Sequence, residues 1–416
     1  MYEKEKNRIK EIVKNQENWR KFECINLIAS ENVTSEIVDG VYKSDFSHRY
    51  AEGDPYKRYY QGTKYIDEAE SLAMRMIGKL FRAKQVSLKP ISGTIANIAA
   101  LDMFASSGDS IMTTSMPFGG HISVARRGGA GVLGLCVTHF QPTEDFFHID
   151  VDKTIKVIEN TKRLSALIFG CTLFLFPQPV KEISKIAKNR GIKIIYDASH
   201  VLGLIAGREF QDPLREGADI ITSSTHKTFF GPQGALILSN MPNKEWKRDK
   251  LSIFPGTISN HHLHRIPALS MAALEFMTFG NDYAKNVIKN AKTLAEVLYN
   301  NGLNVCAEKF GFTKSHQMAI DVKKLGGGKV VAEKLEKNNI IVNKNLLPWD
   351  SADFKTLQNP SGIRIGVQEM TRWGAKSDDM AEIGKLIKKA ISGKDVKKDV
   401  IEFRKNFQEV RYTFKN

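Results

Sequence analysis

Two charged residues follow apolar runs in a pattern that suits an aromatic cofactor. The run IKIIYDASH contains Asp197, with His200 three residues further on, and the run ADIITSSTHK ends in polar residues and Lys227. Their spacing suits a β-α-β-like unit, which would bring both residues to one edge of a parallel sheet. There a lysine can form a Schiff base with pyridoxal phosphate while a carboxylate keeps the pyridine nitrogen protonated. A salt bridge at a strand edge would explain the same pair without a cofactor.

Two glycine-containing turns offer further contacts to such a cofactor. Ser92-Gly93-Thr94 precedes the helical run IANIAALDMFA, so free backbone N–H groups and the helix dipole can receive a phosphate there. An ordinary helix N-cap is the alternative explanation of this turn. Gly119-Gly120-His121 follows another apolar run, and this histidine can either stack on a ring or simply lie in a loop.

Three other motifs predict no site of their own. Residues 129–134 satisfy G-x-G-x-x-G, but the run LCVTHF that follows indicates a strand where a dinucleotide site needs a helix. Residues 326–329 lack the second half of a Walker A motif and are typical of a turn before a helix. His261, His262 and His264 have no carboxylate or cysteine cluster at a ligand spacing nearby, so we expect no metal site.

Strands and helices alternate along the part of the chain that must position these residues. Between about residues 80 and 240 the runs AKQVSLKP, DSIMTT, SALIFGC, IKIIYDAS, DIITSST and GALILS alternate with helical stretches such as TIANIAALDMFAS and VKEISKIAKNRG. This alternation predicts an α/β fold with a mainly parallel sheet, whose ligands bind outside the carboxyl ends of the strands.

The two ends of the chain differ from this central part. We expect an amphipathic helix in the first 23 residues. From residue 266 a long helix, interrupted at residue 281, leads into short strands such as MAIDV and IRIGV. The predicted organisation is a helical arm (1–45), a large α/β domain (46–265) and a smaller C-terminal α/β domain (266–416).

Composition excludes several classes of protein. The 416 residues are 42% hydrophobic and 26% charged, as in globular chains and unlike disordered or collagen-like ones. The charged N-terminus has no signal-peptide core, and the longest mostly apolar stretch, 164–176, is too short for a bilayer, so we expect a cytoplasmic protein without membrane contact. The four separated cysteines disfavour a disulfide framework or a zinc site and fit a reducing compartment. The net charge of +15 suits nucleic acid, an anionic membrane, a polyanionic small molecule or a merely solvated basic surface.

Several segments together resemble the serine hydroxymethyltransferase family of fold-type I pyridoxal phosphate enzymes. They are NLIASENVTS, HRYAEGDPYKRYYQGTKYIDEAE, SGTIAN, GGH, YDASHVLGLIAG, SSTHKTFFGPQGALIL, FPG and SGIRIG, in the family's order over nearly the whole chain. The resemblance implies an aminotransferase-like fold with a large and a small domain, and pyridoxal 5'-phosphate as the cofactor. It further implies reversible transfer of the hydroxymethyl carbon of L-serine to a reduced pterin, which leaves glycine.

The resemblance also implies roles for individual residues. At the cofactor it implies Ser92, Gly93 and Thr94 at the phosphate with His226 beside them, His121 stacked on the ring, Thr172 near the phenolic oxygen, Asp197 at the pyridine nitrogen, His200 beside cofactor and substrate, and Lys227 as the Schiff-base lysine. At the substrate it implies Arg364 and Ser30 on the carboxylate, with Tyr50, Glu52 and Tyr60 supplied by the neighbouring subunit of a homodimer. The expected catalytic residues are Lys227, Glu52, Tyr60 and His226, with Glu52 as a general acid or base.

The chain departs from the common family pattern in ways that leave some questions open. Most members follow FPG with a Gly-Gln-Gly-Gly-type stretch that reaches the partner's phosphate, whereas TISNHHLH here, like NKNLLPWD, resembles archaeal members. Gln233 stands where the family usually has arginine, and the second histidine after GGH is replaced near Val124. The pterin therefore stays open between tetrahydrofolate and tetrahydromethanopterin, and so do dimer against tetramer and the role of the three histidines.

Two rival functions remain compatible with the same residues. A pterin-independent aldolase on this scaffold would cleave threonine-like β-hydroxyamino acids. A basic nucleic-acid-binding protein on an inactive scaffold is the rival from another class, although we expect no nucleic acid as a partner.

Overall fold

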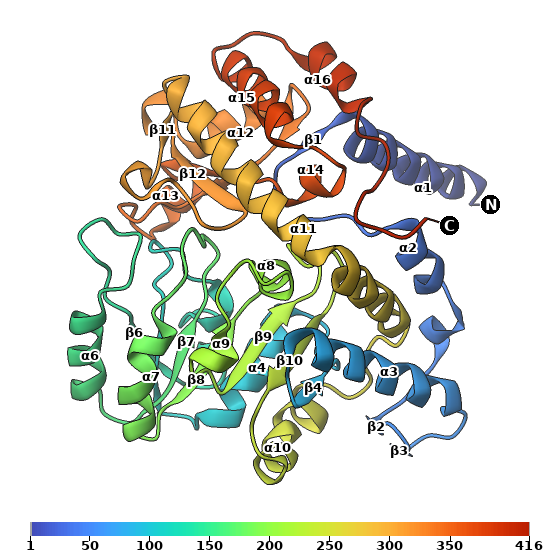
Figure 1. The fold of residues 1–416 in the computed structure, drawn as a ribbon, viewed down its shortest axis with the longest axis vertical. Helices are drawn as coiled ribbons and strands as arrows, with labels where there is room; N and C mark the ends of the chain where they lie inside the picture. The colour runs from blue at the N-terminus through green and yellow to red at the C-terminus, as the bar shows by residue number, and fades with distance from the viewer. Residues whose placement is uncertain (1, 416) are drawn as a thin grey trace. The chain divides into compact units, whose positions relative to one another are not determined.

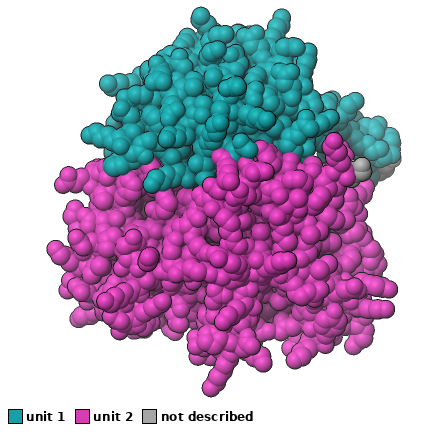
Figure 2. Space-filling view, viewed as in Figure 1, with its two compact units in different colours: residues 1–29, 286–411 teal, residues 30–285, 412–416 magenta. Residues whose placement is uncertain are grey.

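The computed structural model describes residues 2–415. By contacts the chain divides into two compact units, unit 1 (residues 1–29 and 286–411) and unit 2 (residues 30–285 and 412–416), coloured teal and magenta in Figure 2. The division into an arm (1–45) and two domains (46–265 and 266–416) stays a prediction beside this partition by contacts.

Unit 2 is built on a seven-stranded sheet with the strand order β4-β10-β9-β8-β7-β5-β6 (Figure 1). The strands are β4 (Gln85–Ser87), β5 (Ser110–Thr113), β6 (Cys136–His139), β7 (Leu164–Phe169), β8 (Lys193–Asp197), β9 (Ile220–Ser224) and β10 (Ala235–Ser239). Strands β5 to β9 pair in parallel, and only β10 runs antiparallel to its two neighbours in this sheet. The α/β fold with a mainly parallel sheet is thereby confirmed.

Helices and short turns connect these strands. They are α2 (Glu36–Tyr42), η2 (Asp45–His48), α3 (Lys64–Phe81), α4 (Gly93–Phe104), η3 (Ile122–Val124), α5 (Gly129–Val132), α6 (Val151–Asn160), α7 (Val180–Asn189), α8 (Leu202–Ala206), α9 (Pro213–Glu216), α10 (Asn243–Asp249), η4 (Lys250–Ser252) and η5 (Ile253–Thr257), with the hairpin of β2 (Gly53–Asp54) and β3 (Lys57–Arg58) before α3. Helix α7 buries Val180, Ile183 and Ala187 on one face. Gly191 follows its end with φ +68°, the left-handed conformation in which glycine commonly ends a helix.

The core of unit 2 lies between the sheet and α4. Ala96, Ala99 and Ala100 of this helix pack in one cluster with strand residues such as Ile195 and Ile237. The central strands β7 to β10 are mainly apolar because both of their faces are covered. The polar residues of the predicted site lie at or beyond the ends of the strands.

Unit 1 holds a four-stranded antiparallel sheet in the order β11-β12-β15-β14, together with a parallel pair of β1 and β13. The strands are β1 (Ile25–Asn26), β11 (Asn304–Val305), β12 (Gln317–Asp321), β13 (Ile340–Ile341), β14 (Asn343–Asn345) and β15 (Gly362–Gly366). The helices and turns are α1 (Glu3–Gln16), η1 (Glu17–Glu23), η6 (Glu308–Phe310), η7 (Lys323–Leu325), α12 (Gly328–Glu336), α13 (Phe354–Gln358), α14 (Gln368–Arg372), α15 (Ser377–Ile391) and α16 (Lys397–Arg404). The runs MAIDV and IRIGV thus form β12 and β15.

The predicted interruption of the long helix at residue 281 is wrong. Helix α11 runs without a break over Arg265–Asn300. The side chain of Asn281 donates from Nδ2 to the carbonyl oxygen of Gly207 at 2.7 Å, so it does not compete with the hydrogen bonds of its own helix.

Within residues 2–415, no helix has both the length and the hydropathy that a membrane span requires.

Candidate active site

The register of the sheet brings the two residues of the predicted cofactor site to one edge. Asp197 is the last residue of β8 and pairs with Thr222 of the adjacent parallel strand β9. Lys227 follows the end of β9 by three residues. Both groups therefore lie at the carboxyl ends of neighbouring strands, as their spacing predicted.

A pocket of about 130 Å³ at this edge contains nine of the predicted site residues. Its lining comprises Ser92, Gly93, Thr94, Asn97, His121, Cys171, Thr172, Asp197, Ser199, His200, Ser224, His226 and Lys227. The structure thus brings together segments that follow β4, β5, β7, β8 and β9. The roles of these residues stay predictions, whereas their meeting in one pocket is a finding.

Asp197 is held in place by two hydrogen bonds. Its Oδ1 accepts from the backbone N–H of Ser199 at 2.9 Å, and its Oδ2 accepts from Asn97 Nδ2 at 2.8 Å. The Asn97 amide is itself oriented, because its Oδ1 accepts from the Thr222 hydroxyl at 2.6 Å. The carboxylate is therefore fixed in direction before any cofactor binds.

Sequence reasoning missed Asn97, which also connects Asp197 to His121. Asn97 Nδ2 lies 2.9 Å from Ser123 Oγ, and this hydroxyl lies 2.7 Å from His121 Nδ1. Asn97 and Ser123 are both buried. The available signal was a single amide side chain in an otherwise apolar helical run, four residues after Gly93.

The turn before α4 has the chemistry that a phosphate group needs. Ser92 is the N-cap, and its side chain accepts from the backbone N–H of Ile95 at 3.3 Å. Near this turn, Ser224 Oγ and His226 Nδ1 are buried atoms with no hydrogen-bond partner among the described residues. Buried polar atoms without partners cost free energy, and an anion with several acceptor oxygens would engage them beside the helix N-terminus. The residues present therefore fit the phosphate of pyridoxal phosphate.

His226 is neutral in this environment. Burial and the neighbouring charge of Lys227 lower the pKa of His226 from 6.5 to about 4. A neutral imidazole carries one N–H, so it can still donate a hydrogen bond to an anion without a net charge of its own.

The two glycines before His121 are required by close packing. Gly119 has φ +94°, and a Cβ on Gly120 would lie 2.0 Å from the carbonyl oxygen of Thr114. The carbonyl of Gly119 accepts from the backbone N–H of Thr172 at 2.6 Å. This bond ties the turn that carries His121, which follows β5, to the loop that carries Thr172, which follows the adjacent parallel strand β7.

Hydrogen bonds from within the loop and from distant segments hold the loop that carries Lys227. The Thr225 hydroxyl donates to the carbonyl of Pro232 at 2.6 Å, and the Thr228 hydroxyl donates to the carbonyl of His200 at 2.9 Å. Asn32 Nδ2 donates to the carbonyl oxygen of Lys227 at 2.6 Å. Asn32 belongs to the NLIASENVTS segment, but its contact with a residue 195 positions away has no local signature in the sequence.

The remaining predicted residues lie outside this pocket. Tyr50 and Tyr60 are 47% and 41% exposed, with ring centroids 5.1 Å apart, and neither these tyrosines nor Glu52 lines the Lys227 pocket. Arg364 lies on β15 of unit 1, where it is buried and donates from Nε to Asn343 Oδ1 at 3.2 Å. Ser30 is at the start of unit 2.

A larger cavity of about 840 Å³ lies elsewhere in unit 2, between the β2–β3 hairpin, α3 and the region of Trp246 to Phe254. It contains neither Asp197 nor Lys227. We assign the candidate site to the smaller pocket because it contains Asp197 and Lys227, the residues that can bind the cofactor.

The three clustered histidines do not gather around a common point. His261 Nε2 lies 3.1 Å from Glu70 Oε2, while His264 Nε2 lies 3.1 Å from the Tyr42 hydroxyl. Within the described range, no group of three potential metal-ligating side chains occurs.

A family model and two closely similar curated relatives carry the same name. A family model described as "Serine hydroxymethyltransferase" matches residues 2–387. A protein named serine hydroxymethyltransferase from Sulfolobus acidocaldarius is 49% identical over 416 residues, covering 99% of this chain and 95% of its own length. One of the same name from Archaeoglobus fulgidus is 50% identical over 396 residues, covering 94% and 89% of the two chains. A crystal structure of L-threonine transaldolase from Pseudomonas fluorescens in its internal aldimine state superposes with a TM-score of 0.90 at 26% identity, covering 98% of this chain and 93% of that one.

Proposed function

This chain belongs to the serine hydroxymethyltransferase family of pyridoxal-phosphate-dependent one-carbon transferases, and from this premise we propose that it transfers the hydroxymethyl carbon of L-serine to a reduced pterin, reversibly, leaving glycine. The observation that carries the proposal is the placement of Asp197 and Lys227 at the ends of adjacent parallel strands, within one pocket.

Pyridoxal 5'-phosphate is the cofactor, and when bound it supplies an electron-accepting ring that stabilises negative charge at the α-carbon of an amino acid. Lys227 holds it covalently through its ε-amino group. Asp197, oriented by Asn97 and Ser199, keeps a proton on the pyridine nitrogen. Ser92, Gly93, Thr94 and His226 would bind the phosphate, His121 would cover the ring, and Thr172 and His200 would contact the cofactor beside it.

Five residues outside the Lys227 pocket act on the substrates: Ser30, Tyr50, Glu52, Tyr60 and Arg364. Arg364 binds the carboxylate of serine in a bidentate fashion, together with Ser30, and so decides which bond to the α-carbon is broken. Glu52 moves a proton between the serine hydroxyl and the pterin, with Tyr60 nearby.

Two identical chains share each active site in this proposal. Tyr50, Glu52 and Tyr60 stand outside their own chain's Lys227 pocket, and both tyrosines are substantially exposed. This arrangement supports a homodimer in which these three residues complete the site of the partner. A cytoplasmic location remains a prediction.

The carrier of the carbon is a folate-type pterin, either tetrahydrofolate or tetrahydromethanopterin. Lysine and arginine exceed aspartate and glutamate by 15, and this surplus favours binding of the acidic tail that either carrier can have. Turnover of L-serine with each reduced pterin in turn distinguishes the two by kcat/KM.

A pterin-independent aldolase is the second candidate, because the transaldolase named above shares this fold and acts at a β-hydroxyamino acid by its title. The test is glycine formation from L-serine with and without a reduced pterin. We expect the rate to rise at least about tenfold with the pterin, as an added reaction partner must when it accepts the carbon. A rate that is the same in both conditions would favour the aldolase.

A further inference from the structure

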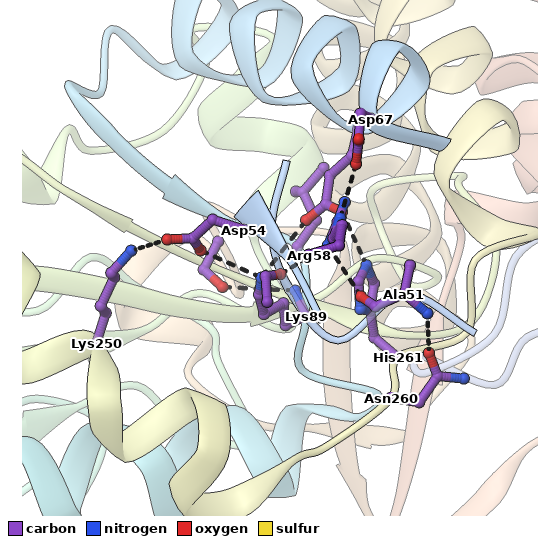
Figure 3. A network of polar contacts seen from close by, with 12 residues as sticks. Ala51, Asp54, Arg58, Asp67, Lys89, Lys250, Asn260 and His261 are labelled. Carbon is purple, nitrogen blue, oxygen red and sulfur yellow. Dashed lines mark hydrogen bonds and ion pairs between the residues drawn. The ribbon is translucent and has the colours of Figure 1, made fainter. Parts of the chain in front are cut away.

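Side chains from two other segments of unit 2 hold the main chain on both sides of Glu52. The backbone N–H of Ala51 donates to Asn260 Oδ1 at 3.0 Å. Arg58 Nη1 donates to the carbonyl oxygens of Ala51 at 2.9 Å and Gly53 at 2.6 Å. Figure 3 shows Arg58 and Asn260 approaching Ala51 from different segments.

Two further contacts complete this arrangement. Lys89 Nζ donates to the carbonyl of Gly53 at 2.7 Å, and the carbonyl of Glu52 itself accepts from the backbone N–H of Tyr59 at 3.1 Å. The side chain of Ala51 packs against Ile66 and Leu263. The main chain on both sides of Glu52 is therefore fixed, while its side chain carries none of these bonds.

Arg58 can make these contacts because buried carboxylates hold its guanidinium. Its Nε lies 2.7 Å from Asp67 Oδ1, and its Nη2 pairs with Glu70; all three side chains are at most 6% exposed. The charges of Glu70 and Asp67 outweigh the burial penalty and raise the pKa of Arg58. A planar group with five donors suits this task, since it can bind two carboxylates and two carbonyls at once.

His261 completes the network through Glu70. Its Nε2 lies 3.1 Å from Glu70 Oε2, and because a carboxylate only accepts, Nε2 carries the proton. Burial lowers the pKa of His261 in spite of this hydrogen bond. His261 is therefore a neutral donor that helps to orient Glu70, which in turn orients Arg58.

Asn260 and His261 belong to the stretch TISNHHLH (257–264), which departs from the common family pattern. The side chain of Asn260 is directed to Ala51, and the side chain of His261 is directed to Glu70 of α3 (Figure 3).

We propose that Asn260, directly, and His261, through Glu70 and Arg58, are positioning residues that hold Glu52 at the angle required for its proton transfer. This inference rests on the proposed function, since it assumes that Glu52 acts on the substrates. Asn260 serves as the acceptor for the backbone N–H that precedes Glu52. His261, through Glu70, keeps Arg58 bonded to the carbonyl groups of Ala51 and Gly53, which flank Glu52.

Replacement of Asn260 tests the proposal. Asn260→Ala removes the acceptor, whereas Asn260→Asp keeps an oxygen in the same place. Asn160→Ala, at the exposed end of α6, is the matched control for loss of an asparagine side chain. Asn260→Ser, whose hydroxyl is too short to replace the amide, substitutes for the alanine variant if that protein does not fold.

Three quantities are measured on each protein. They are kcat for pterin-dependent conversion of L-serine, the visible absorbance of the bound cofactor, and hydrogen exchange of residues 50–60 with and without the cofactor. For Asn260→Ala we expect kcat to fall about fivefold and exchange in this segment to rise, because one hydrogen bond to the main chain is lost. The cofactor absorbance should not change, and Asn260→Asp should recover most of the activity.

Glu52→Gln, measured in parallel, separates the two levels of the account. If Glu52→Gln is inactive while Asn260→Ala keeps normal kcat and normal exchange, the positioning proposal is wrong and the proposed function stands. If Glu52→Gln keeps full activity, Glu52 does not act on the substrates, and both its role in the proposed function and the positioning proposal are overturned. Loss of cofactor absorbance in Asn260→Ala would also contradict the proposal, because the segment would then act on the cofactor pocket.

Discussion

The Lys227 pocket and the segment around Glu52 are built in different ways. In the pocket, each residue lies at a strand end, in a loop that follows one, or in the first turns of α4, so the sheet largely sets its position. The Glu52 segment contains only a two-residue hairpin pair, and it is held by charged groups from α3 and Lys89 and by the neutral side chains of Asn260 and His261.

The two ways of building suit two different tasks, which are cofactor binding in the pocket and the completion of a shared site by the Glu52 segment. A cofactor that stays bound through every turnover benefits from a site fixed by regular secondary structure. In the homodimer that we propose, the Glu52 segment would act beside a partner chain and would have to hold its shape while exposed, and charge-assisted hydrogen bonds provide that rigidity. The pocket and the segment should therefore respond differently to substitution and to pH.

The largest effect is expected for Lys227→Ala. Without the ε-amino group no Schiff base can form, so the variant should lose both turnover and the visible absorbance of the bound cofactor. Lys188→Ala, on the exposed end of α7, is the control and should keep both. A Lys227→Ala protein with wild-type absorbance would place the Schiff base on another lysine.

Asp197→Asn should have the next largest effect. The amide keeps the size of the side chain but cannot hold a proton on the pyridine nitrogen, so kcat should fall roughly a hundredfold or more, as for other buried charge pairs that lose one partner. Hydrogen exchange of residues 50–60 should be unchanged, which keeps this effect within the pocket. A variant within threefold of wild-type kcat would remove Asp197 from the mechanism.

The smallest effect concerns the pH dependence of stability in the Glu52 segment. Burial lowers the pKa of His261 below its usual 6.5. As the pH falls below 6.5, the unfolded chain therefore binds more protons than the folded one, and the stability of the fold decreases. Burial opposes ionisation of Glu70, but its hydrogen bond with His261 and the charges of Lys89 and Arg58 lower its pKa to about 2, so a further loss is expected as the pH falls from 4.5 towards 2.

His261→Gln keeps a side-chain N–H for Glu70 but does not titrate. Between pH 7.5 and 5.5 the melting temperatures of both proteins should fall. The fall should be smaller for the variant than for the wild type, with a difference of about 2 °C for a chain of this size. Thermal unfolding followed by circular dichroism at both pH values measures this. Equal slopes in the two proteins would show that His261 is not the group that titrates.

The sequence predicted the Lys227 pocket better than the contacts of the Glu52 segment, for a physical reason. Apolar strands that are covered on both faces have clear ends, so Asp197 and Lys227 could be placed at one edge from local pattern alone. Asn97 was missed because its role depends on which face of α4 meets β8 and β9, and no local pattern encodes that. The contact between Asn260 and Ala51 spans 209 positions, and only the folded chain reveals it.

The family resemblance supplied what local patterns could not. Glu52, Tyr60 and Arg364 have no signature of their own in composition or periodicity, and they entered only through the matching segments. The predicted break in α11 failed for the opposite reason, since a local signal at residue 281 was outweighed by a tertiary hydrogen bond to Gly207.

The most direct test of the central claim is reduction of the cofactor-loaded protein with borohydride, followed by mass spectrometry of its peptides. Reduction converts a Schiff base into a stable bond and so marks the lysine that carries it. We predict a single pyridoxyl group on the peptide that contains Lys227, and none on that peptide in Lys227→Ala. A pyridoxyl group on a different lysine, with the Lys227 peptide unmodified, would contradict the assignment of the active site.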